Sequence, residues 1–152
     1  MSLSIQEEHY PTLMCFGCGH ANPKGFHLRS YARDGGVIAS FTPGPEHDNG
    51  FGFTNGGVVT TVLDCHTAAA VVEAARVAGI RGEPGAQLPF ITAGFDVRFL
   101  RPTPLGPPLE LWAKATTVGE QEMVVEAELR EGGKVRATMR ATWKRFRPRP
   151  AP

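Results

Sequence analysis

Apolar and polar residues alternate through much of the second half of the chain, which is the pattern of strands with one buried face. The clearest case is residues 124–130, where charged side chains at 126, 128 and 130 alternate with apolar ones at 125, 127 and 129. Short links that contain glycine favour hairpins between the later strands. We predict four strands here, over residues 91–101, 109–118, 122–130 and 134–146.

A long apolar segment precedes these strands. Residues 56–78 consist mainly of Val, Leu and Ala, contain no proline, and are followed by Gly79. The β-branched residues lower the intrinsic helix propensity, but a long run without proline that ends at a glycine favours a helix over a strand. Because polar residues are few in its first half, we expect this helix to be largely enclosed.

The first third of the chain adds one further predicted strand, residues 37–42, which alternate in the same way. Residues 15–35 are rich in Gly, Pro, Asn and His and predict a loop, and so do the turn-rich residues 43–50 and the Gly/Pro-rich residues 79–90. One helix among antiparallel strands predicts an α+β fold in which the sheet curls around the helix.

Length and composition fit one globular domain. The chain has 152 residues, of which 41% are hydrophobic and 20% charged. We assign residues 1–14 to an N-terminal leader, 15–146 to a single domain and 147–152 to a basic, proline-rich tail. We expect no apolar run to reach the length needed to span a membrane. The N-terminus lacks the basic and apolar regions of a signal peptide, so we expect a cytoplasmic protein.

Charge and motifs exclude several classes of function. The net charge of +1 gives no general attraction to nucleic acid, and we interpret the basic residues of the tail as solvated. Three cysteines without a secretion signal indicate reduced thiols rather than disulfides. The sequence has no phosphate-binding P-loop, no dinucleotide-binding fingerprint and no Gly-x-Ser-x-Gly nucleophile motif.

The start of the predicted helix is a candidate oxyanion site. Gly56 and Gly57 open the helix, and free N–H groups at a helix N-terminus favour an anion or a developing negative charge. The alternative is that Asn55 only caps the helix while the two glycines relieve crowding against the sheet.

Asp64 is the one carboxylate in the apolar half of the helix, and a buried acid needs a partner. It follows Gly57 by seven residues and falls on nearly the same face, about 10 Å further along the axis. One acyl carbonyl cannot reach both within a single helix, so a shared site requires a second, antiparallel copy and lies at a dimer interface. Alternatively, the Asp64 carboxylate only bonds Thr60 or Thr67.

The other residues with reactive side chains are interpreted as structural. His66 points roughly 200° away from Asp64 around the helix, which disfavours an Asp-His dyad and favours a core or interface histidine. Cys65 is interpreted as a small packing residue.

Cys15 and Cys18 stand at a zinc-like spacing, but a structural zinc site needs four ligands and the chain has no second cysteine pair. A histidine would have to complete the set; the candidates are His20, His27 and His47. We predict no metal and interpret this segment as a loop packed over the domain.

The chain from about Cys15 to Trp143 resembles the hotdog-fold acyl-CoA thioesterases of the PaaI-like branch. That family commonly shows His-Gly-Gly, with an Asp nine residues after the His and an Asn six residues before it. Asn49 and Asp64 stand at these distances, whereas Asn55 replaces the usual His. The matching positions are Asn49, Gly52, Asn55-Gly56-Gly57, Leu63-Asp64, Thr92 and Pro102, and the opening segments Cys15-Phe16-Gly17-Cys18-Gly19 and Asn22-Pro23-Lys24-Gly25 resemble one subgroup.

The resemblance implies roles for these positions. Asp64 would activate the hydrolytic water and Thr92 would help to hold it, while the Gly56 N–H, assisted by Asn49, would polarise the thioester carbonyl. The Gly of one subunit would pair with the acid of the other. Asn55 and Gly57 would contact the substrate. Apart from the resemblance, we expect the loop of Phe51 and Phe53 to contact the acyl group, and Arg101 or the basic tail to meet the CoA phosphates.

We therefore expect an acyl-CoA thioesterase of the hotdog fold that acts on an acyl or aryl-acyl thioester, with Asp64 as the general base or, alternatively, as the nucleophile, and that uses no cofactor. The expected partners are acyl-CoA and a second copy, paired through residues 91–101 as a homodimer that is also compatible with a homotetramer. We expect neither nucleic acid nor membrane as a partner. The alternative is a non-catalytic acyl-CoA-binding or sensing protein, because Asn55 replaces His. Hydratase or dehydratase chemistry is disfavoured, since no acid and His are suitably spaced, and a small zinc module is the remaining alternative.

Overall fold

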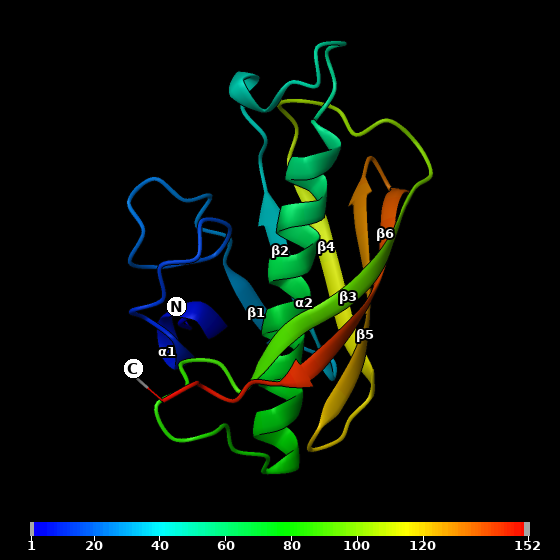
Figure 1. Ribbon diagram of the computed structural model, residues 1–152. Coiled ribbons are helices and arrows are strands. Elements are labelled where there is room, and N and C mark those ends of the chain that lie inside the picture. Colours follow the sequence, from blue (N-terminus) through cyan, green and yellow to red (C-terminus); the bar gives the residue numbers. More distant parts are fainter. Residues whose placement is uncertain (1, 151–152) are drawn as a thin grey trace.

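The computed structural model describes residues 2–150, and one long helix dominates it (Figure 1). The elements are α1 (Ile5–His9), β1 (Ser30–Arg33), β2 (Gly36–Phe41), a 3-10 turn η1 (Pro45–His47), α2 (Gly56–Ala78), β3 (Phe90–Phe99), β4 (Leu109–Thr117), β5 (Glu122–Glu131) and β6 (Lys134–Arg145). The six strands form one antiparallel sheet in the order β1-β2-β4-β5-β6-β3.

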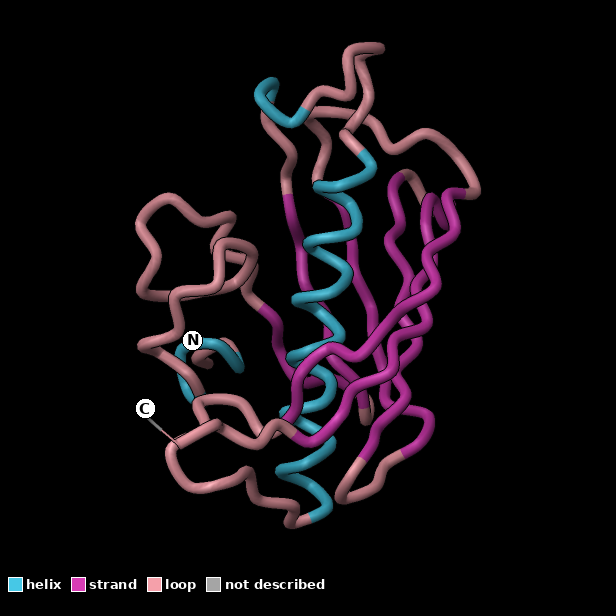
Figure 2. The backbone as a smooth tube through the Cα atoms, viewed as in Figure 1, coloured by secondary structure: helices cyan, strands magenta, loops and turns pink. Residues whose placement is uncertain are grey.

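Helix α2 lies along one face of this sheet (Figures 1 and 2). Strand β1 forms one edge of the sheet and β3 the other, so the last four strands of the chain fold back to place β3 beside β6. The predicted α+β arrangement, with a single long helix against an antiparallel sheet, is confirmed.

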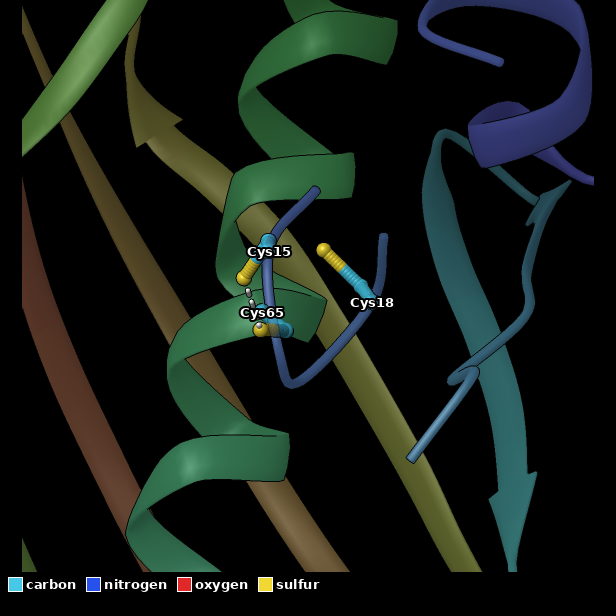
Figure 3. A group of neighbouring side chains, drawn as sticks. All are labelled: Cys15, Cys18 and Cys65. Carbon is cyan, nitrogen blue, oxygen red and sulfur yellow. Dashed lines mark hydrogen bonds between the residues drawn. The ribbon is translucent and has the colours of Figure 1, made fainter. Parts of the chain in front are cut away.

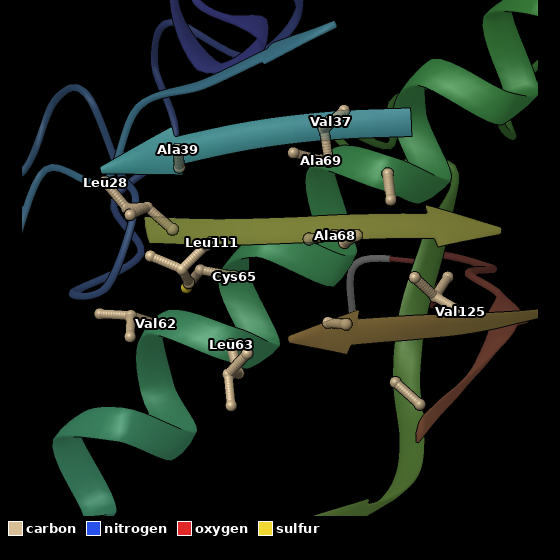
Figure 4. Packing of buried hydrophobic residues seen from close by; sticks show 14 of the residues in the cluster. Leu28, Val37, Ala39, Val62, Leu63, Cys65, Ala68, Ala69, Leu111 and Val125 are labelled. Carbon is tan, nitrogen blue, oxygen red and sulfur yellow. The ribbon is translucent and has the colours of Figure 1, made fainter. Parts of the chain in front are cut away.

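The core fills the space between α2 and the sheet (Figure 4). In β4, Leu109, Leu111 and Ala113 are buried, whereas Glu110 and Trp112 between them are exposed, so each strand gives one face to the helix. The helix contributes the fully buried Val62, Leu63 and Ala69. Burial of each large aliphatic side chain contributes about 1.5–3 kcal/mol, and this one-sided packing fixes the orientation of α2.

The predicted bounds of the long helix are confirmed at both ends. Asn55 caps the first turn, and Gly79 ends the helix in the left-handed conformation, with φ of 70°, where its N–H bonds the carbonyls of Ala75 and Arg76. The strand predictions over residues 37–42, 91–101, 109–118, 122–130 and 134–146 are confirmed to within two residues at each end.

Strand β1 corrects the prediction of a continuous loop over residues 15–35. It is short, and only its first residue, Ser30, is buried, so it has no apolar alternation to reveal it. The hairpin to β2 turns at Asp34 and Gly35, both with positive φ. Asp-Gly is a favoured pair for such a turn, and this was the local signal for the missed strand.

The segment that we predicted to be a leader packs against the domain. Helix α1 has a capping box, in which Ser4 and Glu7 bond each other's backbone N–H groups, and this Ser-x-x-Glu pattern is a helix-start signal. Ile5 and Tyr10 are buried, and the Gln6 side-chain oxygen accepts a hydrogen bond from the Ser30 N–H at 2.8 Å. Residues 4–10 are therefore part of the fold. Of the predicted tail, residues 151–152 lie outside the described residues.

Helix α2 also corrects the statement that no apolar run reaches the length of a membrane span. By length and composition alone, this helix of 23 residues is long and apolar enough to cross a membrane. Two thirds of that apolar window is buried inside the domain, as in the core helix of a globular protein.

We predict that Leu129→Ala lowers the free energy of unfolding by about 2–5 kcal/mol, because Leu129 is fully buried between β5 and α2. Denaturant titration monitored by circular dichroism measures this value. Leu3→Ala is the matched control, since Leu3 is 61% exposed, and its effect stays within about 0.5 kcal/mol. Equal effects for the two variants would contradict the assignment of this core.

Candidate active site

The start of α2 presents one backbone donor to an open cavity. The Asn55 side-chain oxygen accepts the Gly57 N–H at 2.7 Å, which is the expected cap. The Gly56 N–H has no acceptor within residues 2–150. The cap interpretation and the oxyanion-site interpretation are therefore compatible. Asn55 caps the helix through Gly57 and leaves the Gly56 N–H available to a ligand.

A cavity of about 520 Å³ opens in front of Gly56. The loop before α2 and the end of β3 form its walls, and most of the residues that line it are apolar. Of the predicted site residues, it brings together Asn49, Phe51, Phe53, Gly56 and Arg101. Its other lining residues are Thr54, Val59, Phe99, Leu100, Pro102 and Thr103.

Sequence reasoning did not assign Phe99 and Leu100 to this cavity. A Cβ built at Gly56 would lie 3.4 Å from the Phe99 ring, so the ring packs directly over the helix start. Both side chains are more than half exposed, although they stand in or next to a strand. Two large apolar residues in succession break the alternation at the end of this strand, and this was the available signal in the sequence.

Asn49 organises the loop that forms one wall of the cavity. Its side-chain oxygen accepts the N–H groups of Phe51 at 2.8 Å and Phe53 at 3.3 Å, while Asp48 accepts those of Gly50 and Gly52. Gly50 and Gly52 both have positive φ, a conformation in which glycine is favoured. Because its oxygen is engaged in the loop, Asn49 can offer only its side-chain NH₂ to a ligand.

The Asp64 carboxylate lies elsewhere on α2, where Thr92 of β3 donates a hydrogen bond from Oγ1 to Oδ1 at 2.9 Å. The alternative partners are excluded by geometry. Thr60 donates to the Gly56 carbonyl at 2.7 Å, and Thr67 donates to the backbone carbonyl of Asp64 at 2.8 Å. Thr92 therefore holds the carboxylate itself.

The electrostatic setting of Asp64 suits a proton acceptor. Its side chain is partly buried, and burial raises the pKa of the carboxyl above its ordinary value, against the opposing effect of the Thr92 hydrogen bond. A raised pKa makes the carboxylate a stronger base than a solvated one.

Thr92 stands at an irregularity in the sheet. The pairing of β3 with β6 shifts between Thr92 and Gly94, which is a β-bulge. Bulges of this kind redirect side chains and occur next to functional sites.

Gly56 and Asp64 are separated within one chain. Eight residues of helix place them about 12 Å apart along the axis. The cavity at Gly56 contains neither Asp64 nor Thr92. The two halves of the predicted site thus lie at different levels of α2.

His66 is a core residue, as predicted. It is fully buried, with Nδ1 2.9 Å from the Ser30 hydroxyl and Nε2 3.1 Å from the Val37 carbonyl oxygen, to which it donates. Burial lowers the pKa of the imidazole to about 4. Both ring nitrogens are occupied, so this histidine is a neutral part of the core and forms no dyad with Asp64.

Comparison with known proteins agrees with this architecture. A family model described as Thioesterase superfamily matches residues 51–138, which are more than half of the chain. No curated protein matches the chain. A thioesterase superfamily protein from Shewanella loihica PV-4 is 30% identical, with a TM-score of 0.62 over 84% of this chain and 97% of that one.

Two further solved structures share the fold at lower identity. The Escherichia coli PaaI protein of the phenylacetic acid degradation operon is 20% identical, with a TM-score of 0.65 over 80% of each chain. The protein smu.793 from Streptococcus mutans UA159, solved with acetyl-CoA bound, is 17% identical, with a TM-score of 0.64 over 78% of this chain and 88% of that one. The predicted hotdog fold and the resemblance to PaaI are confirmed.

We predict that Asn55→Ala lowers the free energy of unfolding by about 1 kcal/mol, because it removes the acceptor of the Gly57 N–H. Asn55→Asp keeps a capping oxygen and is the matched control, with a change of only a few tenths of a kcal/mol. Thermal and denaturant unfolding of the two variants measure the difference. An equal loss in both variants would show that the cap is not what Asn55 contributes.

Proposed function

The chain belongs to the thioesterase superfamily, and we propose that it hydrolyses an acyl-CoA or aryl-acyl-CoA thioester, with Asp64 activating the attacking water. The observation that carries this proposal is the Asp64 carboxylate held by Thr92 at 2.9 Å in a partly buried setting. One donor fixes the orientation of the carboxylate and leaves its second oxygen available for a water. Thr92 is thus placed to orient the base rather than to act alone.

The proposed reaction needs only groups that this chain supplies. The Asp64 carboxylate takes a proton from water as the water oxygen bonds to the thioester carbonyl carbon. The resulting oxyanion accepts a hydrogen bond from the Gly56 N–H. The carbon–sulfur bond then breaks, the proton passes to the departing sulfur, and a carboxylic acid and the free thiol leave.

We propose that the complete site forms between two copies of the chain. Strand β3 is an edge of the sheet, and its exposed apolar side chains, Ile91, Phe95 and Phe99, lie along it. An exposed apolar edge strand favours pairing with another strand. In antiparallel self-pairing, the start of one β3 meets the end of the other.

Because of the contacts of β3 with α2, this pairing would bring the two halves of the site together. Thr92, near the start of β3, bonds Asp64, whereas Phe99, at its end, packs over Gly56. A twofold axis near Phe95 and Asp96 would place Thr92 of one copy opposite Phe99 of the other. Asp64 of one subunit would then face the cavity at Gly56 of its partner, and each dimer would hold two equivalent sites.

The proposed substrate fits the cavity at Gly56. Its lining is mainly apolar, as an acyl or aryl group requires, and Arg101 at the same cavity is exposed and carries the positive charge that CoA phosphates require. The acetyl-CoA bound by the Streptococcus relative supports the same class of ligand.

We also propose a cytoplasmic location, and a homotetramer made of two such dimers.

We predict that Asp64→Asn lowers kcat at least about 100-fold, because the amide cannot accept the proton from water. Thiol release from a panel of aliphatic and aryl acyl-CoAs measures the rate. Glu73→Gln is the matched control, since Glu73 is an acid of the same helix that forms an ion pair with Arg76 at 2.8 Å, and the rate of this variant stays near wild type. Undiminished turnover in Asp64→Asn would remove Asp64 from the mechanism. Saturable acyl-CoA binding without hydrolysis in the wild type would instead support the non-catalytic alternative.

We further predict that two inactive variants restore activity when mixed. Gly56→Pro removes the proposed oxyanion donor at the first helical position, where proline is well tolerated, and Gly56→Ala, which keeps the N–H, is its control. In a mixed dimer with Asp64→Asn, one of the two interface sites is intact, so random assembly gives about one quarter of wild-type activity. Co-expression of the two variants with different affinity tags provides this mixture. No recovery in the purified mixed dimer would place the whole site within one chain.

A further inference from the structure

Three cysteines from two distant segments converge beside α2 (Figure 3). Cys15 and Cys18 lie on the N-terminal loop, and Cys65 lies on α2, next to Asp64 in the chain. Their three Sγ atoms lie within 4.8 Å of one another, and Cys15 Sγ is 3.7 Å from Cys65 Sγ. Sequence reasoning counted only the first two as candidate ligands, because Cys65 is fifty positions away from Cys15.

The loop is shaped to hold these sulfurs together. The Gly19 N–H bonds the Cys15 carbonyl at 2.7 Å, and a Cβ at Gly19 would lie 2.4–2.6 Å from three backbone atoms. A Cβ at Gly17 would lie 2.4 Å from Cys65 Sγ. A Cβ at Gly19 would collide with the loop's own backbone and one at Gly17 with the Cys65 side chain, so glycine lets the loop close on itself and lie directly against α2.

The sulfurs are also withdrawn from solvent. Cys18 and Cys65 are buried, Cys15 is half-buried, and all three are free cysteines rather than disulfide partners. The group therefore offers three free sulfurs to one ligand from the protein side.

We propose that Cys15, Cys18 and Cys65 bind one Zn²⁺ ion, with its fourth position open to water or another small ligand. Zinc–sulfur bonds of about 2.3 Å in a tetrahedral site place the sulfurs about 3.8 Å apart, which matches the Cys15–Cys65 separation. Binding forms three zinc–sulfur bonds, and the protons of the thiols that become ligands are released to solvent. The proposed hydrolysis uses no metal, so this inference stands apart from it.

A zinc ion accounts for the geometry better than a disulfide does. A disulfide joins two sulfurs and gives the third cysteine no partner, whereas here all three sulfurs lie close to one another. The nearby histidines are engaged elsewhere: His20 Nδ1 lies 3.0 Å from the Arg29 guanidinium, and His27 bonds the Asn22 carbonyl. The ion would fasten the N-terminal loop to α2 beside Asp64.

We predict that protein purified without chelator contains about one zinc per chain, the stoichiometry of a single thiolate site. Elemental analysis by mass spectrometry measures it. Cys18→Ser and Cys65→Ser each reduce the zinc content at least tenfold, whereas His20→Ala, in the same loop, retains it. Less than one tenth of a zinc per chain in wild-type protein that has been incubated with Zn²⁺ would overturn the proposal.

A second measurement keeps the test decisive if a serine variant fails to fold, because it uses only the wild-type chain. Replacement of zinc by Co²⁺ gives a thiolate-to-cobalt charge-transfer absorption in a cysteine site and none in an oxygen site. A mercurial thiol reagent then releases one metal ion as three thiols react. Fewer than three reactive thiols in the unfolded, unreduced protein would show an oxidised pair and overturn the zinc assignment.

Discussion

Helix α2 is covered by the sheet on one side and contacted by the N-terminal segment on another, and this packing sets the positions of Asp64, Cys65 and His66. The apolar seam between the helix and the strands fixes the rotation of α2. That rotation turns Asp64 toward β3, Cys65 toward the loop of Cys15, and His66 toward β1 and β2. Three successive residues thus enter three different environments, because each step along a helix turns the side chain by about 100°.

The same packing separates two kinds of polar group. His66 is enclosed, bonded at both nitrogens and held neutral, so it contributes to the uniqueness of the core. Asp64 is only partly buried and has a single side-chain partner, Thr92, within the described residues. A buried polar group with all its bonds made is structural, whereas one with an unused oxygen at the surface of the core can still bind and react.

Much of the fold could be predicted from sequence because local rules governed it. The bounds of α2 followed from a run without proline, an Asn at its start and a Gly at its end. Strand β1 was missed because all its side chains after Ser30 are exposed and show no alternation, although the Asp34-Gly35 turn marked it. The only sequence signal for helix α1 was likewise its capping box.

The site was less accessible to local reasoning. Thr60 and Thr67 were the natural partners for Asp64 by spacing, but helical threonines bond backbone carbonyls, as both do here. The actual partner, Thr92, was implicated by the resemblance and not by any local pattern. The convergence of Cys65 with Cys15 and Cys18 depends on how a loop without regular structure packs, and no periodicity encodes that.

The bulge in β3 determines which face of the sheet the side chains at the two ends of the strand point to. Thr92 and Phe99 are seven positions apart, and in a regular strand an odd separation would send their side chains to opposite faces of the sheet. The bulge assigns Thr92 to Trp143 and Gly94 to Thr142, so Ala93 is an extra residue, and Thr92 and Phe99 oppose Trp143 and Ala137, which are six apart. Both side chains can therefore face α2, one at Asp64 and the other at Gly56. A single extra residue in the strand thus lets the side chains at both ends of β3 point toward the same helix.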